Sequence, residues 1–325
     1  MVRAERIGTG GNSRVYRVDT ASGSYAAKHY FHAAADGRSR LEAEFRGLQF
    51  LWDNHIRCVP QPLAAEREAQ LAVFQFIPGC EPRMESVTEG DIDQLARFLA
   101  ALRPLTSAPA AAAIGPAAEA CFAVADIAAN IRRRLDLLVA VGDEAGAHRD
   151  MRRYLDAQFI PALHRWEEAA RAAVGEEGYA VALPVAARTL SPSDFGFHNA
   201  LRGEDGRLTF VDFEYFGWDD PAKLISDFLW HPRSTVADGL KARFAGRMLA
   251  SYSDIPGVAT RLEAVFPLYG LKWCMILLNE FRAENLARRR FAGRSSEETE
   301  AVLQAQLGKA KRTLERVDRG PIGFN

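Results

Sequence analysis

Two aspartates and an asparagine stand out as residues whose types and spacing could do chemistry. Asn199 follows Asp194 by five residues, and Asp212 follows Asn199 by thirteen. The first carboxylate can orient a hydroxyl nucleophile, while the asparagine and the second carboxylate can hold the magnesium ions of a nucleotide. The spacing therefore indicates phosphoryl transfer, with Asp194 as the catalytic carboxylate and Asn199 and Asp212 as the metal ligands.

A hairpin must bring these residues together. Residues 208–212 read as a short apolar strand that ends at Asp212, and residues 203–206 form a glycine-bounded turn just before it. We expect the two carboxylates to flank this hairpin and to meet at one edge of a cleft.

The triplet Asp194-Phe195-Gly196 spells the metal-binding triplet of protein kinases. The sequence shows no apolar strand directly before it, whereas one precedes Asp212. We therefore assign the metal role to Asp212 and the nucleophile-orienting role to Asp194. An aspartate and an asparagine at this spacing also occur by chance in polar loops, so the assignment depends on independent features elsewhere in the chain.

A glycine-rich segment near the N-terminus is the first of these features. Residues 7–16 place Gly8 and Gly10 just before a strand of alternating apolar residues. Glycines let the main chain approach phosphates closely and present N–H donors to them. Ser13 stands where protein kinases usually place a third glycine. We assign Gly8, Gly10 and Ser13 to nucleotide binding, although the pattern is also typical of a plain hairpin.

A lysine and a helical segment follow. Lys28 lies in a predicted strand, residues 25–30, where a lone lysine is usually an exposed edge charge. Residues 40–51 have helical spacing, and Glu44 flanks their apolar face. Glu44 can therefore point toward Lys28 and hold its ammonium against the α- and β-phosphates. Glu42 is the alternative partner, for which we expect the role of a solvated helix charge.

A possible hinge comes next. Residues 71–77 read as a buried strand that ends abruptly at Pro78-Gly79, as expected between two lobes. Beyond it, Thr88 to Asp91 form a capping box that opens a helix. Residues 117–140 and 146–174 have helical patterns, the second interrupted at Pro161, and the C-terminal part is again helical.

Five elements occur in order along the chain: the glycine-rich segment, the lysine strand, the glutamate helix, the hinge strand and the hairpin between the two aspartates. Together they resemble the aminoglycoside phosphotransferase and choline kinase-like family, over residues 5–80 and 185–232. The resemblance implies an α+β, protein-kinase-like fold with two lobes. Residues 1–79 would form a small antiparallel sheet lobe that binds nucleotide, and residues 80–325 a larger, mainly helical lobe. It also implies ATP and Mg²⁺ as cofactors, adenine bound by the main chain of Gln75 and Ile77, and transfer to a hydroxyl of a small molecule such as a sugar or amino alcohol.

The chain departs from the family pattern at two places. The family usually has His-Gly-Asp at the catalytic aspartate, and this chain has Pro192-Ser193-Asp194. The family's aspartate that supports the catalytic loop would fall near Leu224, where this chain offers Asp220 and Asp227 instead. We favour Asp227, because the apolar residues that follow it can bury it against the loop.

Composition bounds the class of protein. The 325 residues are 48% hydrophobic with a formal net charge of −1, which predicts a folded chain. We expect no transmembrane span, no signal peptide and no nucleic-acid module. The four cysteines are scattered, which predicts reduced thiols rather than a zinc site, and hence a cytoplasmic protein.

Charge is unevenly distributed along the chain. Residues 241–325 carry 15 basic and 9 acidic residues, so residues 1–240 carry 26 and 33 of the totals of 41 and 42. The basic C-terminal part favours a neutral or anionic acceptor over a polycationic drug, or it is simply a solvated helix face.

Two rival functions remain. A protein kinase is disfavoured because only fifteen residues separate Asp212 from Asp227 and no Ala-Pro-Glu segment follows. A pseudokinase, acting as a nucleotide-binding regulatory or scaffold module, would be favoured by loss of the lysine or a metal ligand, and all of these are present.

Overall fold

The structure is a computed structural model that describes residues 3–7, 13–31, 39–141, 146–282 and 296–320. It divides into two compact units. The first comprises Met1–Ala120, Ala186–Phe228 and Pro232–Asp254, and the second comprises Cys121–Val185, Leu229–His231 and Ile255–Asn325. All the predicted site residues fall in the first unit. The predicted lobe boundary at residue 79 lies inside that unit and stays a prediction.

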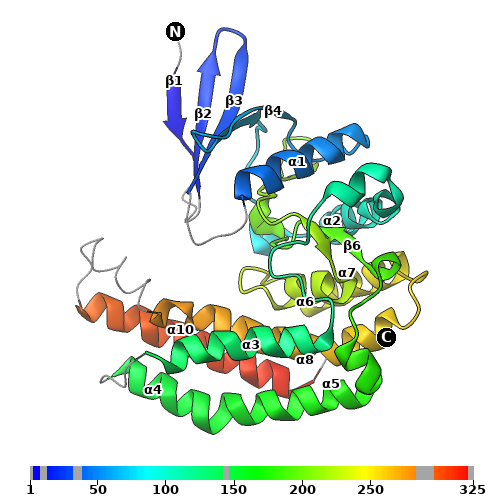
Figure 1. The fold of residues 1–325 in the computed structure, drawn as a ribbon. Helices are drawn as coiled ribbons and strands as arrows, with labels where there is room; N and C mark the ends of the chain where they lie inside the picture. The colour runs from blue at the N-terminus through cyan, green and yellow to red at the C-terminus, as the bar shows by residue number, and fades with distance from the viewer. Residues whose placement is uncertain (1–2, 8–12, 32–38, 142–145, 283–295, 321–325) are drawn as a thin grey trace. The chain divides into compact units, whose positions relative to one another are not determined.

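A five-stranded antiparallel sheet forms the N-terminal part of the first unit (Figure 1). Its spatial order is β1-β2-β3-β5-β4, with every neighbouring pair antiparallel. Gly23 has φ of 137° at the turn between β2 and β3, a conformation that residues with a β-carbon rarely adopt. The strands are β1 Arg3–Arg6, β2 Ser13–Thr20, β3 Gly23–Tyr30, β4 Pro62–Glu66 and β5 Leu71–Gln75.

Helix α1, Arg40–Asp53, follows the third strand. Ser39 caps it by accepting a hydrogen bond from the N–H of Glu42. Its buried face includes Leu41, Leu48 and Leu51, as the helical spacing predicts. A β-carbon on Gly47 would lie 2.6 Å from Cδ1 of Phe216, so only glycine lets α1 approach the segment after Asp212 this closely.

Helix α2, Glu89–Leu102, begins with the predicted capping box, in which Thr88 and Asp91 satisfy each other's main-chain N–H groups. Arg243 of helix α7, Asp238–Ser251, donates two hydrogen bonds to Asp93 of α2. Helix α6, Pro221–Trp230, packs on α7 through the rings of Phe228 and Phe244, whose centroids are 4.0 Å apart and whose planes are tilted by 36°.

Two short antiparallel ladders complete the first unit. β7, Ala200–Arg202, pairs with β8, Leu208–Phe210, and β6, Thr189–Ser191, pairs with β9, Gly217–Asp219. The predicted hairpin between Asn199 and Asp212 is therefore confirmed. Single 3₁₀ turns connect these elements: η1 Met84–Ser86, η2 Pro104–Ser107, η3 Pro109–Ala113, η5 Val185–Ala187 and η6 Phe197–Asn199.

The second unit is helical among its described residues, and α3, α5, α8 and α10 are its long helices (Figure 1). A π-turn, η4 Leu155–Phe159, separates α4 from α5 just before Pro161, which lacks the N–H that a continuous helix needs. The elements are α3 Val124–Val139, α4 Ala147–Tyr154, α5 Ile160–Ala180, α8 Val258–Leu277, η7 Leu278–Phe281 and α10 Ser296–Asp318.

Residues 258–281 are long and apolar enough to cross a membrane by length and composition, but 78% of the most apolar window is buried inside the protein. The central helix of a folded unit has these same properties.

Candidate active site

Lys28 is the centre of a buried ionic cluster. It lies on β3 opposite Val15 of β2 and Ala72 of β5, and only 5% of the residue is exposed. Its Nζ lies 2.6 Å from Glu44, 2.5 Å from Asp212 and 3.5 Å from Glu214. Burial alone lowers the pKa of Lys28, but the three carboxylates more than offset this effect and raise it above the ordinary value. The ammonium therefore stays charged.

Glu44 is fixed from three sides. Its carboxylate accepts hydrogen bonds from Lys28 Nζ at 2.6 Å, from the Tyr30 hydroxyl at 2.8 Å and from the N–H of Phe213 at 3.2 Å. Glu42 instead pairs with Arg46 and Arg67. The sequence-based choice of Glu44 over Glu42 as the lysine partner thus agrees with the geometry.

Asp212 stands at the end of the β7–β8 hairpin, and its side chain is 40% exposed. Its φ of 67° is a left-handed conformation, which aspartate tolerates better than most residues. The N–H of Val211 donates to the carbonyl of Asn199 at 2.9 Å, so the two predicted metal ligands lie at the same open end of the hairpin.

Asp194 lies on the loop before this hairpin. His198 Nε2 is 3.0 Å from Asp194 Oδ1, and Asn199 Nδ2 donates to the main-chain carbonyl of Asp194 at 2.9 Å. A β-carbon on Gly196 would lie 2.9 Å from the His198 ring, so glycine makes room for the imidazole. The bond to the Asp194 carbonyl uses the amide nitrogen of Asn199, so the amide oxygen is the atom that could serve as a metal ligand.

A cluster of phenylalanines anchors both aspartates. Phe195 and Phe213, the residues after Asp194 and Asp212, have ring centroids 5.6 and 6.1 Å from that of Phe98 on α2. Both are buried, and burial of a phenylalanine contributes about 1.5–3 kcal/mol. The repeated Asp-Phe pair therefore places each carboxylate next to a residue fixed in the core.

The strand criterion that separated the two aspartates was wrong in one respect. Strand β6 ends at Ser191, so a short strand does precede Asp194 closely. The geometry distinguishes the aspartates instead: Asp212 contacts the buried lysine, whereas Asp194 contacts His198.

The two acids considered for support of the catalytic loop have different positions. Asp220 caps α6, since its carboxylate accepts from the N–H of Ala222 at 2.8 Å. Asp227 lies 2.9 Å from Lys223 Nζ, and Lys223 donates to the Ser193 hydroxyl at 3.0 Å. Asp227 thus reaches the loop through a lysine to which the sequence analysis assigned no role.

The predicted nucleotide-binding residues are only partly described. Gly8 and Gly10 lie outside the described residues, and Ser13 opens β2 opposite Tyr30. Gln75 ends β5, and its N–H donates to the carbonyl of Gln61 at 2.8 Å. Ile77 follows in a segment without regular secondary structure and is half-buried. The nucleotide contacts assigned to these residues stay predictions.

Carboxylate oxygens of Glu44, Asp212 and Glu214 lie within 4.8 Å of one another. Magnesium prefers such oxygen ligands and keeps several waters. Asp212 is the most exposed of the three, so this donor set fits a hydrated magnesium ion on the solvent side of the cluster. Glu214 is a member of the cluster that the sequence analysis did not single out, although it is two residues from Asp212.

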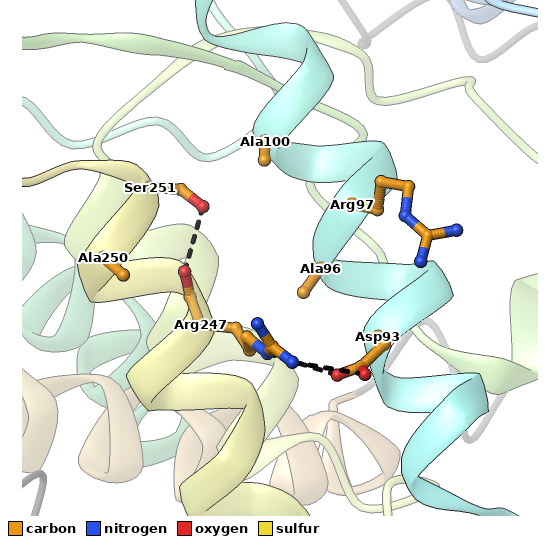
Figure 2. A pocket seen from close by; sticks show the side chains of 7 residues that line it. All are labelled: Asp93, Ala96, Arg97, Ala100, Arg247, Ala250 and Ser251. Atoms are coloured by element: carbon orange, nitrogen blue, oxygen red, sulfur yellow. Dashed lines mark hydrogen bonds and ion pairs between the residues drawn. The ribbon is translucent and has the colours of Figure 1, made fainter.

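A separate pocket of about 370 Å³ lies between α2 and α7 (Figure 2). Arg247 of α7 pairs with Asp93 of α2 across its floor, and Ser251 donates to the carbonyl of Arg247. None of the predicted site residues lines it. Its lining is Asp93, Ala96, Arg97, Ala100, Arg247, Ala250 and Ser251.

Comparison with known proteins gives the family. The sequence profile of the Phosphotransferase enzyme family matches residues 3–265. The chain belongs to this family. The predicted family and the prediction of a phosphotransferase enzyme are thereby confirmed. No curated protein sequence matches this family member.

Solved structures share the fold of this phosphotransferase family member. Choline kinase from Cryptosporidium parvum Iowa II has a TM-score of 0.62 at 10% identity, over 98% of this chain and 90% of that chain. Spectinomycin phosphotransferase in complex with ADP and spectinomycin has a TM-score of 0.60 at 13% identity, over 96% and 92%. Ethanolamine kinase from Plasmodium vivax has a TM-score of 0.59 at 13% identity, over 95% of this chain and 82% of that chain. The predicted α+β, protein-kinase-like fold is confirmed.

Proposed function

We propose that this phosphotransferase moves the γ-phosphoryl group of ATP to a hydroxyl of a small molecule. One observation carries the proposal: the hairpin end that holds Asn199 and Asp212 lies against Lys28, with Asp194 on the preceding loop. Phosphoryl transfer needs three parts: a cation that binds the phosphates, oxygen ligands that hold a metal ion, and a carboxylate that orients the acceptor hydroxyl. The ADP in the solved spectinomycin phosphotransferase supports a nucleotide as the phosphoryl donor.

Each side chain has a distinct role in this proposal. Lys28 binds the α- and β-phosphates, and Glu44 aims it. Asp194 orients the acceptor hydroxyl and finally takes its proton. His198 holds Asp194 Oδ1 while this happens. Since the transition state of phosphoryl transfer is loose, catalysis comes mainly from positioning and charge neutralisation.

Asn199 and Asp212 would hold magnesium, with Glu214 close by. When bound, the ion would neutralise phosphate charge and fix the geometry of the transferred group. The oxygen-rich donor set described above supports Asp212 and Glu214, and the place of Asn199 at the same hairpin end supports the asparagine.

A neutral or anionic acceptor, such as a sugar or a phosphorylated metabolite, fits the charge of the chain better than a polycationic drug. Residues 241–325 carry six more basic than acidic residues, 15 against 9. A pocket for a polycation needs an excess of carboxylates. Choline kinase and ethanolamine kinase share this fold, so an amino alcohol, which carries a single positive charge, is the alternative acceptor.

The test is ADP release with magnesium and a panel of sugars, amino alcohols and aminoglycosides. We expect turnover that disappears when magnesium is chelated, and a sugar or other neutral or anionic acceptor as the best substrate. Faster turnover of a kanamycin-like compound than of any sugar would overturn the acceptor class. Nucleotide binding without turnover of any acceptor would favour the pseudokinase instead.

A cytoplasmic location is part of the same proposal. An enzyme that uses ATP needs the compartment where ATP is abundant, and the four cysteines are all free thiols. Fractionation of cells that express the chain checks it.

A further inference from the structure

A buried lysine lies behind the catalytic loop. Lys223 of α6 is 1% exposed. Its Nζ lies 2.8 Å from Asp219, 2.9 Å from Asp227 and 3.0 Å from the hydroxyl of Ser193. A lysine ammonium has three N–H donors and no acceptor, so these three oxygens use its full capacity. Two of the partners neutralise the charge. The third belongs to the residue before Asp194.

Ser193 has an unusual main-chain conformation. Its φ of 68° is left-handed, which is uncommon for a residue with a β-carbon and persists where the surroundings over-determine it. Three hydrogen bonds hold Ser193 in this conformation. The Ser193 N–H donates to Ser191 Oγ at 2.9 Å, its hydroxyl donates to the carbonyl of Ala118 at 3.0 Å, and the same hydroxyl accepts from Lys223.

The direction in which the chain leaves Ser193 decides where Asp194 points. The N–H of Asp194 donates to the carbonyl of Pro192 at 3.0 Å, which closes a tight turn around Ser193. A change of φ at Ser193 would rotate this turn and move the Asp194 carboxylate. The ammonium of Lys223 therefore acts on Asp194 through one intermediate residue.

We propose that Lys223 is a positioning residue that fixes the catalytic carboxylate through Ser193, an inference that rests on the proposed role of Asp194. The family pattern would place an aspartate near Leu224 for this purpose. This chain places a cation there, held by Asp219 and Asp227, and has a serine where the family has glycine. The serine before Asp194 and the lysine near the position of the missing aspartate thus belong to one hydrogen-bonded cluster.

A purely structural ion pair would make a different prediction. If Lys223 served only to neutralise Asp219 and Asp227, removal of the Ser193 hydroxyl would act only through its bond to the carbonyl of Ala118, and its effect on kcat would be the same with or without Lys223. If it positions Asp194, the same removal lowers kcat while nucleotide binding at Lys28 is kept.

The first experiment compares Ser193→Ala with Ser226→Ala. Ser226 is a buried serine on α6, the helix that carries Lys223, and its hydroxyl makes no hydrogen bond in the described part of the chain. We expect Ser193→Ala to lower kcat roughly 10- to 100-fold, since small misplacement of a catalytic group costs that much, with the KM for ATP within about twofold. Ser226→Ala should leave both values near wild type. Equal kcat values in the two variants would overturn the proposal.

The second experiment tests whether the effect comes from Lys223. Lys223→Met leaves two buried carboxylates without a counter-ion, so it is made together with Asp219→Asn and Asp227→Asn, and folding is checked by thermal denaturation. In that background Ser193→Ala should cause little further loss of kcat, because the interaction is already gone. A loss as large as in the wild-type background would show that Ser193 acts without Lys223.

The third measurement needs no activity. Hydrogen exchange of residues 191–199 should be faster in Ser193→Ala than in Ser226→Ala, with exchange of β3 unchanged. Unchanged exchange in the loop would refute the positioning role even if no acceptor were turned over. Absence of turnover in the wild-type protein would instead refute the proposed function, so the two failures are distinguishable.

Discussion

Replacement of Glu44 by glutamine tests the centre of the proposed site most directly. The residue is 4% exposed and accepts hydrogen bonds from Lys28, Tyr30 and the N–H of Phe213. Glutamine keeps the shape, removes the charge and replaces one acceptor oxygen by an NH₂ group. Either the N–H of Phe213, which donates to Oε1, or both Lys28 and Tyr30, which donate to Oε2, then lose their acceptor. Asp212 and Glu214 still surround the ammonium, so the lysine remains charged but is aimed less well.

The magnitude follows from these contacts. A hydrogen bond to a charged group contributes about 1.5–3 kcal/mol, and each 1.36 kcal/mol corresponds to a tenfold change in rate. Glu44→Gln should therefore lower kcat/KM for ATP by roughly 10- to 100-fold, and Lys28→Ala by more. Glu42→Gln is the matched control on the same helix. Its ion pairs with the exposed Arg46 and Arg67 contribute about 0–1 kcal/mol, so the loss should stay below about fivefold.

The assay is ADP release over a range of ATP concentrations at saturating acceptor, with thermal denaturation to confirm that each variant is folded. A Glu42→Gln enzyme that is more impaired than Glu44→Gln would refute the assignment of the helix face. A Glu44→Gln enzyme within about twofold of wild type would refute the role of the pair.

Three further predictions concern other parts of the site. Asp194→Asn should lower kcat by about 10²–10⁴-fold and leave calorimetric binding of magnesium–ATP nearly intact, whereas Asp212→Asn should abolish the magnesium dependence of ATP binding; the reverse pattern would exchange the two roles. His198→Phe keeps a buried ring but removes the donor to Asp194, so kcat should fall about tenfold with the KM for ATP unchanged, and an unchanged kcat would contradict this. Gly79→Ala should lower the free energy of unfolding by about 1–3 kcal/mol, because φ is 152° and the new β-carbon would lie 2.7 Å from the carbonyl oxygen of Arg202. Gly246→Ala, with open space around it, is its control in denaturant unfolding and should not be destabilising.

The sequence was sufficient for the parts of the site that depend on local periodicity. The strand pattern placed Lys28 in a strand, and helical spacing placed Glu44 rather than Glu42 on the side that faces it. The Gly203–Gly206 turn predicted the hairpin that joins Asn199 to Asp212. In each case one element, or two joined by a short turn, determines where the side chain points.

The contacts that the sequence could not predict join elements far apart in the chain. Lys223 reaches Ser193 across thirty residues, and Ser193 reaches Ala118 across seventy-five. A lysine on an apolar helix reads as a surface charge until its three acceptors are known. Likewise, the carbonyl of Gly115 accepts a hydrogen bond from the N–H of Trp218 on β9. No local pattern encodes such pairing.

The attachment of the chain just after Gly79 has a mechanical consequence. The N–H of Cys80 donates to the carbonyl of Arg202 at 3.3 Å, and the N–H of Arg202 donates back at 2.8 Å. Since β5 ends at Gln75, a swing of the N-terminal sheet would bend residues 76–79, and it would also strain the hydrogen bond from the N–H of Phe210 to the carbonyl of Cys58 at 2.8 Å. Asn199 directly precedes β7 and stays with the pinned side, while Lys28 travels with the sheet. A swing about this short pivot would open the phosphate-binding side of the site and leave the spacing of Asn199 and Asp194 unchanged.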